Sequence, residues 1–271
     1  MRTRINSGAW VEHEDVGRGP TLVFLHAFPF CREMWQPQRS RLEGEFRLII
    51  PDLPGFGGSS GFVAEPSIDQ MAENTASLLD ALGILGPVTL AGLSMGGYVA
   101  LAFARKYPQR LRALILANTR AEPDDETAKA NRNRLIAEAA QKSVAEIFEP
   151  MLPRMVSPAT LAHRPDVVAE VRRLASQQSA TAVIAASQAL RDRPDSRPHL
   201  VHITVPTLVI SGRDDIITPP PVLTALAEAI PSARLVSIEQ AGHLANLEQP
   251  DAFNECLMTF LRSLQPSPIS T

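Results

Sequence analysis

Short apolar segments recur along the chain and alternate with segments whose apolar residues follow helical spacing. Most of the short segments are continuously apolar, which is typical of strands covered on both faces of a sheet. The pattern predicts strands at residues 21–25, 46–50, 88–91, 111–116, 207–210 and 234–238. Their alternation with helices indicates an α/β fold with a mainly parallel central sheet flanked by helices.

Three helices of this expected core have recognisable starts. The segment 67–82 opens with a capping-box pattern, Ser67-x-x-Gln70, and continues with an apolar stripe. The segment 95–107 follows the third strand directly, and 251–264 begins after Pro250, a residue favoured in the first turn of a helix.

One long region breaks the alternation. Between about residues 120 and 205 the sequence shows helical patterns punctuated by proline and no convincing strand. The helical patterns lie at 131–141, 144–152, 166–177 and 181–191. We therefore expect a core domain formed by residues 1–119 and 206–271, with residues 120–205 inserted as a helical cap, or lid.

Composition narrows the class of protein. The 271 residues carry a net charge of −3, which argues against a nucleic-acid partner. No apolar run is long enough to span a membrane, and no signal peptide is recognisable, so no membrane association and a cytoplasmic location are expected. The histidines lack metal-ligand spacing and no nucleotide-binding glycine motif occurs, so no metal and no cofactor are expected. Oligomeric state is not readable from the sequence.

Basic residues and prolines are unusual in number. Only three of the 26 basic residues are lysine, and the 23 prolines outnumber the 15 glycines. Proline in loops lowers the entropy of the unfolded chain, which leads to the hypothesis of a thermally robust protein. A GC-rich genome would give the same counts, and composition alone leaves both explanations open.

The strongest chemical signal is Gly92-Leu93-Ser94-Met95-Gly96. It matches the G-x-S-x-G motif, and it lies between a predicted strand and a predicted helix, which is the context that the motif requires. A sharp turn there would expose the hydroxyl of Ser94, and the backbone N–H of Met95 would lie beside it. The alternative is a glycine-rich turn that only happens to contain a serine.

A serine hydroxyl needs a base and an orienting acid to become a nucleophile. In this fold they follow the serine in the order acid, then histidine. Asp214 and Asp215 come after the predicted strand 207–210, and His243 comes after the strand 234–238. Both positions are at the carboxyl ends of strands, where sites of α/β sheets gather.

With these motifs in place, nearly the whole chain outside the helical insertion resembles the α/β-hydrolase superfamily. His26-Ala27-Phe28-Pro29 is similar to the HGFP loop of that family, and the segment Pro51–Ser59 is similar to its PDLxGFGxS stretch. The likeness is greatest to small bacterial arylesterases, perhydrolase-like esterases and 3-oxoadipate enol-lactonases. It implies a triad of Ser94, Asp215 and His243, because Gly212-x-x-Asp215 matches the family's G-x-x-D pattern and leaves Asp214 as the alternative acid.

The resemblance also implies an oxyanion hole made by the backbone N–H groups of Phe28 and Met95. The chain departs from the family at Ala27, where glycine is usual. The Phe28–Pro29 bond is a candidate cis peptide. His26 is expected to brace this loop, and Asp52 to hold the segment Pro51–Ser59.

The function expected from the resemblance is cofactor-free hydrolysis of a small-molecule carboxylic ester. Enol-lactone hydrolysis, C–C bond hydrolysis and perhydrolysis use the same triad and stay open. Serine in the motif excludes the related dehalogenases and epoxide hydrolases, which use aspartate there. A binding or signalling protein with slow turnover is the alternative from another class.

Substrate identity is not determined by the sequence. Arginines of the insertion could meet a substrate carboxylate, but a charged face in contact with solvent is the preferred interpretation; they are Arg132, Arg134, Arg172 and Arg173. The apolar residues of the insertion are interpreted as ordinary packing rather than as pocket walls; they are Phe148, Met151, Leu152 and Met155.

Overall fold

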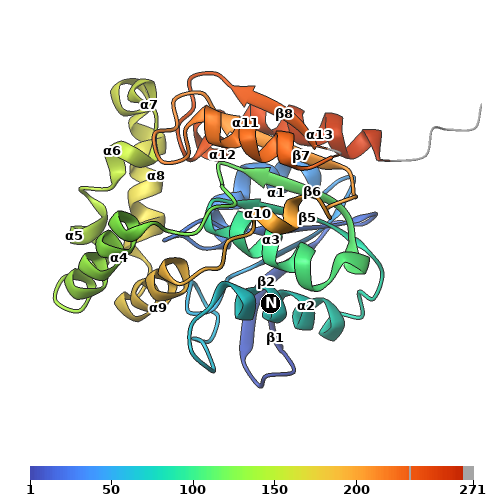
Figure 1. Ribbon diagram of the computed structural model, residues 1–271, viewed down its shortest axis with the longest axis horizontal. Helices are drawn as coiled ribbons and strands as arrows, with labels where there is room; N and C mark the ends of the chain where they lie inside the picture. Colours follow the sequence, from blue (N-terminus) through green and yellow to red (C-terminus); the bar gives the residue numbers. More distant parts are fainter. Residues whose placement is uncertain (232, 265–271) are drawn as a thin grey trace, which may run out of the picture.

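A computed structural model describes residues 1–231 and 233–264 of the chain. Within these ranges the strands form one eight-stranded sheet in the order β1-β2-β4-β3-β5-β6-β7-β8 (Figure 1). The strands β3 to β8 run parallel, whereas β1 and β2 are antiparallel to their neighbours at one edge. The expected α/β fold with a mainly parallel sheet is confirmed.

The strands are β1 (Arg2–Arg4), β2 (Trp10–Val16), β3 (Thr21–Leu25), β4 (Arg47–Pro51), β5 (Val88–Leu93), β6 (Leu111–Ala117), β7 (Thr207–Gly212) and β8 (Ala233–Ile238). The helices outside the insertion are α1 (Gln36–Leu42), α2 (Ile68–Ala81), α3 (Met95–Lys106), α11 (Pro220–Ala229), α12 (Ala245–Glu248) and α13 (Pro250–Ser263), with short 3-10 turns at Arg32–Trp35 and Pro108–Arg110.

The sheet is covered on both faces, which explains why its strands are continuously apolar. Along β3, Val23 and Leu25 pack into one apolar cluster and Leu22 and Phe24 into the other. The first cluster includes apolar residues of α2, α3 and α11, and the second includes those of α1, α12 and α13. Alternate side chains of a strand therefore contribute to two separate halves of the core.

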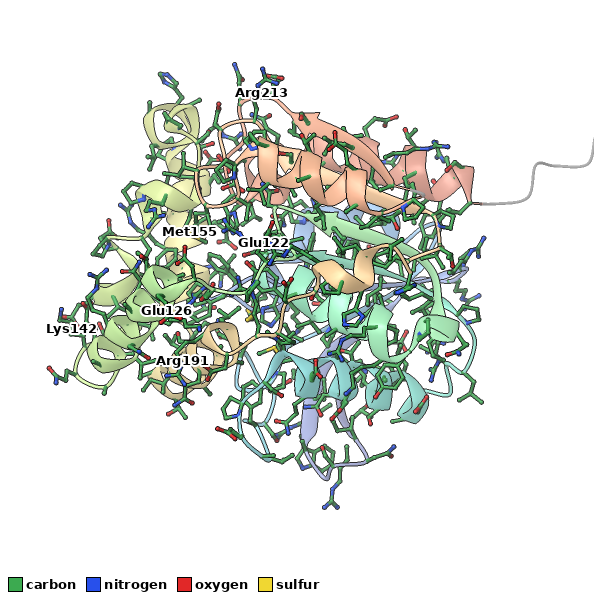
Figure 2. The ribbon with its side chains drawn as sticks, in the orientation of Figure 1. Glu122, Glu126, Lys142, Met155, Arg191 and Arg213 are labelled. Atoms are coloured by element: carbon green, nitrogen blue, oxygen red, sulfur yellow. The ribbon has the colours of Figure 1, made fainter. Side chains whose placement is uncertain are left out.

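Between β6 and β7 the chain forms only helices, gathered mainly at one side of the molecule (Figure 1). They are α4 (Glu126–Ala139), α5 (Val144–Phe148), α6 (Leu152–Met155), α7 (Pro158–His163), α8 (Pro165–Ser176), α9 (Ala180–Arg191) and α10 (Arg197–Leu200). The ring of Phe148 packs edge-on against that of Phe30, with 5.8 Å between the ring centres. The helix α5 therefore packs directly on the core. Figure 2 places Met155 on the core-facing side of these helices, with Lys142 towards their outer edge.

Prolines occur in the first turns of many helices, both in the insertion and outside it. Examples are α1, α7, α8, α11 and α13. In the first turn of a helix, a backbone N–H has no acceptor within the helix. Proline, which has no N–H, therefore loses no hydrogen bond there, and its fixed φ angle suits the helix. Many of the prolines that are unusual in the composition thus occupy positions where they limit only the unfolded chain.

No helix in residues 1–231 and 233–264 has the length and apolar character needed to cross a bilayer.

Candidate active site

Ser94 lies at the sharp turn between β5 and α3, as the motif predicts. Its backbone has φ +53° and ψ −112°, a combination of dihedral angles that residues other than glycine seldom adopt. The N–H of Ser94 donates to the carbonyl of Ala117 at 3.0 Å, and its own carbonyl accepts from Thr119 Oγ1 at 2.9 Å. The strained turn is therefore fixed by the adjacent strand β6, and Ser94 is half-buried.

Two glycines of the motif allow the close packing of this turn. A Cβ on Gly92 would lie 2.1 Å from the carbonyl oxygen of Gly96, and a Cβ on Gly96 would lie 2.0 Å from that of Leu25. Real Cβ atoms do not approach backbone this closely, so α3 can begin directly against the end of β3 only because both positions are glycine.

We expect Gly96→Ala to lower the free energy of unfolding by about 1–3 kcal/mol, because the added methyl group displaces Leu25. It should also lower turnover, since Leu25 leads into the loop that carries Phe28. Urea unfolding and steady-state kinetics measure the two effects. Gly86→Ala is the control, because a Cβ there has no atom within 4 Å. Equal stability and turnover in both variants would contradict the expectation.

The three residues expected from the motifs lie together. Nε2 of His243 is 2.8 Å from Oγ of Ser94, and Nδ1 of His243 is 2.8 Å from Oδ2 of Asp215. His243 and Asp215 are each only 2% exposed, whereas Asp214 is exposed on the same loop. An imidazole in this position can accept the serine proton while the carboxylate holds its other nitrogen protonated.

Asp215 is held by more donors than the sequence indicated. Its Oδ1 accepts from the N–H groups of Ile217 and Thr218 at 2.8 and 3.0 Å. Its Oδ2 accepts from Thr218 Oγ1 and, at 2.8 Å, from Nδ2 of Asn118. Burial by itself raises the pKa of the Asp215 carboxyl, but the charge of His243 and these hydrogen bonds outweigh it and lower the pKa to about 2.

This low pKa makes stability depend on pH in a defined window. Because the folded pKa of Asp215 lies below its ordinary value of 3.8, its contribution to stability is complete above that value and is lost as the pH falls from about 4 through 2. The loss should be of the order of 2 kcal/mol. Urea unfolding between pH 2 and 6 should show a shallower decline for Asp215→Asn than for the wild type. Parallel curves for the two proteins would contradict this role of the carboxylate.

Two backbone N–H groups are the candidates for the oxyanion hole that the sequence predicts. Phe28 is 6% exposed and Met95 is fully buried, yet among the described residues neither N–H donates to a protein acceptor. Buried N–H groups without a partner are rare in folded proteins, and a substrate oxygen would supply the missing acceptor. The Phe28–Pro29 peptide bond, the candidate cis bond of the sequence, is cis.

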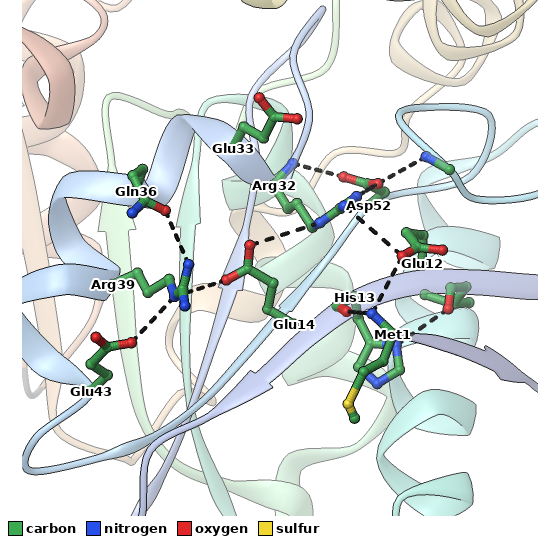
Figure 3. A network of polar contacts seen from close by, with 12 residues as sticks. Met1, Glu12, His13, Glu14, Arg32, Glu33, Gln36, Arg39, Glu43 and Asp52 are labelled. Atoms are coloured by element: carbon green, nitrogen blue, oxygen red, sulfur yellow. Dashed lines mark hydrogen bonds and ion pairs between the residues drawn. The ribbon is translucent and has the colours of Figure 1, made fainter.

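The loop that carries Phe28 is braced by a histidine and by a buried carboxylate. Nε2 of His26 accepts from the N–H of Leu53 at 2.8 Å. Asp52, 1% exposed, accepts from the N–H of Arg32 at 2.8 Å, pairs with its guanidinium, and accepts from the N–H of Gly58 at 3.0 Å. Figure 3 shows Arg32 reaching from Asp52 towards the acidic side chains of β2. Both side chains hold the loops as the sequence predicts.

The interpretation of the insertion's arginines as a solvent face is wrong for Arg132. Its side chain is 24% exposed, pairs with Asp124 at 3.1 Å, and places its guanidinium 5.9 Å from the centre of the Phe28 ring. Asp124 also binds Arg193, whose guanidinium lies 4.3 Å from the ring of Tyr98. Two arginines thus share the carboxylate of Asp124, and their guanidinium groups lie near the rings of Phe28 and Tyr98. The other three arginines of that group are 42 to 72% exposed, as expected; they are Arg134, Arg172 and Arg173.

Cys31 offers no competing nucleophile. Its side chain is 3% exposed, and burial raises the pKa of the thiol to about 11, so the thiol is protonated at neutral pH.

Comparison with known proteins agrees with this geometry. The family model of the alpha/beta hydrolase fold matches residues 20–250. A 3-oxoadipate enol-lactonase of Acinetobacter baylyi is 31% identical over 90% of this chain and 89% of its own length. A pimeloyl-[acyl-carrier protein] methyl ester esterase of Nitrosomonas europaea is 31% identical over 92% and 98%.

Among solved structures, a thermophilic esterase of Thermogutta terrifontis superposes with a TM-score of 0.94 and 39% identity, covering 98% of this chain and 99% of that one. The family match spans most of the chain, and the relatives named above are two esterases and an enol-lactonase. The chain belongs to the alpha/beta hydrolase fold family and is a hydrolase.

Proposed function

We propose that the protein is a cofactor-free serine hydrolase of small carboxylic esters. The observation that carries this proposal is the unbroken chain from Oγ of Ser94 through His243 to Asp215, with 2.8 Å at each step. The N–H groups of Phe28 and Met95, two buried residues, lack a protein acceptor among the described residues, which supports a role for them as donors to the substrate oxygen. The similarity to esterases supports the same class of reaction.

The proposed reaction has two steps. Oγ of Ser94 attacks the ester carbonyl while Nε2 of His243 takes its proton, and the N–H groups of Phe28 and Met95 stabilise the negative oxygen. His243 then gives this proton to the leaving alcohol, and an acyl-enzyme remains. A water molecule, deprotonated by His243, attacks the acyl carbonyl. Collapse of this second tetrahedral intermediate breaks the bond to Oγ and releases the acid, while Nε2 of His243 returns its proton to Oγ of Ser94. Asp215 orients the imidazole and stabilises its charged form throughout.

We propose that residues 120–205 form a cap over this site. The support is that α5 packs on Phe30 through Phe148, while Arg132 of α4 lies over Phe28. A cap in this position would shape the space available to the ester.

Multiple-turnover kinetics on a simple aryl acetate test the proposed function. Sustained release of the phenol in the presence of a chelator is the expected result. A single burst of phenol with no further release would favour the alternative of a binding or signalling protein. No release from any ester would reject the proposal that the protein hydrolyses esters.

A second candidate, hydrolysis of an acidic enol-lactone, is favoured by Arg132. Three observations support an anionic substrate: the placement of this guanidinium beside Phe28, the similarity to an enol-lactonase, and the fact that the Thermogutta esterase was solved with malate, a dicarboxylate, bound. Asp124 is shared by two arginines, so the cluster keeps one net positive charge.

If the substrate is anionic, Arg132→Met should raise its KM by about tenfold or more, because a charge-assisted hydrogen bond is lost. KM for a neutral aryl acetate should stay unchanged, and Arg134→Met, on the exposed side of the same helix, should change neither. Measuring acidic and neutral esters and lactones with the three proteins decides between the candidates. An equal KM change for acidic and neutral substrates would remove the acidic candidate.

A further inference from the structure

A buried carboxylate close to the site has no role in the mechanism above. Glu248 ends the short helix α12, five residues after His243, and is 0% exposed. Its Oε1 accepts from the N–H of Gly242 at 2.8 Å. Its Oε2 accepts from the N–H of Ser157 at 2.6 Å and from Oγ1 of Thr160 at 2.8 Å.

No cation within the described residues neutralises this carboxylate. Its oxygens form no ion pair there, and Arg164, which pairs with Asp166, contacts only the backbone carbonyl of Glu248 at 3.4 Å. Burial raises the pKa of the Glu248 carboxyl, so holding it ionised has a cost in free energy. The ionised form nevertheless suits its surroundings, because both backbone partners can only donate.

The three donors belong to two distant parts of the chain. Gly242 directly precedes His243, whereas Ser157 and Thr160 lie at the beginning of α7 in the insertion. Glu248 therefore links the histidine loop to the insertion through the two oxygens of one carboxylate.

Further contacts show that this junction is tight. The N–H of Leu244 donates to the carbonyl of Met155 at 3.1 Å, at the core-facing position that Figure 2 labels. A Cβ on Gly242 would lie 2.6 Å from the nitrogen of Ser157. The residues on both sides of His243 are thus in direct backbone contact with the insertion.

The opposite side of the same glycine is tied to the acid of the triad. The carbonyl of Gly242 accepts from Nδ2 of Asn118 at 3.3 Å, and the same Nδ2 donates to Oδ2 of Asp215 at 2.8 Å. Glu248 holds the N–H of Gly242 and Asn118 holds its carbonyl, so the residue before His243 is restrained from both sides.

We propose that Glu248 is a positioning residue that couples the inserted helices to His243. By binding Gly242, Ser157 and Thr160 together, it keeps the imidazole aligned between Ser94 and Asp215. This inference rests on the proposed function for its effect on turnover. The coupling itself concerns only the placement of His243 and has a readout of its own.

The test compares Glu248→Gln, Thr160→Val and Glu149→Gln with the wild type. The amide introduced by Glu248→Gln would keep the shape of the side chain but turn one donor towards partners that donate. We expect kcat on an aryl acetate to fall by about 10- to 100-fold with KM unchanged, since small misplacement of a catalytic group has effects of this size. Thr160→Val removes one hydroxyl of the insertion and should lower kcat in the same way but less. Glu149→Gln removes a surface carboxylate of the insertion that pairs with Arg172, and should leave kcat unchanged.

The second readout is the proton NMR signal of the Nδ1–H of His243, which reports its bond to Asp215. It should shift or be lost by exchange in Glu248→Gln and Thr160→Val and stay in place in Glu149→Gln, all well below the unfolding temperature. If Glu248→Gln fails to fold, Thr160→Val decides. Wild-type kcat and an unmoved His243 signal in the folded variants would overturn the proposal. A wild-type protein that hydrolyses no ester would reject the proposed function, while the NMR signal would still test the coupling.

Discussion

Ser94→Ala is expected to reduce turnover of an aryl acetate by a factor on the order of 10⁵–10⁶, which is the effect of removing the nucleophile from a serine hydrolase triad. The reason is that His243 would keep its bond to Asp215 but would have no hydroxyl to deprotonate within 2.8 Å. The residual rate would come from the oxyanion donors and from substrate binding alone.

The control for this experiment is Ser263→Ala, which alters an exposed serine at the end of α13. Circular dichroism and urea unfolding of Ser94→Ala should match the wild type closely, because the hydroxyl contributes no packing to the core. Turnover that survives in a folded Ser94→Ala protein would reject Ser94 as the nucleophile.

Asp215→Asn is expected to lower kcat by about 10⁴-fold, since an amide in place of the acid favours the wrong tautomer of the histidine. The substitution keeps the size of the side chain in a site that is 2% exposed. It replaces an acceptor of five hydrogen bonds, one of them from Nδ1 of His243, by a group that can accept on one side only. Steady-state kinetics on the aryl acetate measure the loss.

Asp214→Asn is the matched control, because it makes the same chemical change one residue earlier on an exposed side chain. Its kcat should stay within about twofold of the wild type, since surface substitutions away from such contacts have small effects. A larger loss in Asp214→Asn than in Asp215→Asn would mean that the wrong carboxylate has been chosen.

Much of the sheet could be predicted because its central strands are buried on both faces. The segment 21–25 coincides with β3, and the starts of β5, β6 and β7 agree with the predicted ones. The prediction missed β1 and β2, since Trp10–Val16 is rich in acidic residues and buries a histidine, His13, where an apolar residue would have revealed the alternation. It also missed α11, because the consecutive prolines at 219–221 resemble a loop although they begin a helix.

The candidate triad could be predicted because each member follows a strand in a recognisable order. The residues that hold it could not. Asn118 lies 97 residues from Asp215, and Thr160 lies 88 residues from Glu248, so only the fold brings each pair together. A polar residue with positive φ at the end of β6, as at Asn118, is a signal that only the backbone reveals.

Arg132 shows the same limit in the insertion. The helix α4 buries a single residue, Ala139, so its sequence gives no apolar stripe from which to orient its arginines. Arg132 is half-buried: it pairs with Asp124, just before the same helix, and its guanidinium lies near the ring of Phe28, which comes from a distant part of the chain. A long polar side chain can cover apolar surface while its charge is paired. The spacing of apolar residues along the sequence does not reveal such a contact.

The central claim, that an activated Ser94 forms a covalent intermediate, is tested most directly by reaction with an aryl phosphonate ester. Such a reagent phosphonylates an activated serine and stops before the second step. Peptide mass spectrometry should find one adduct per chain, on Ser94, and His243→Ala should form it far more slowly. Continued ester hydrolysis without an adduct, or with the adduct on another residue, would contradict the account.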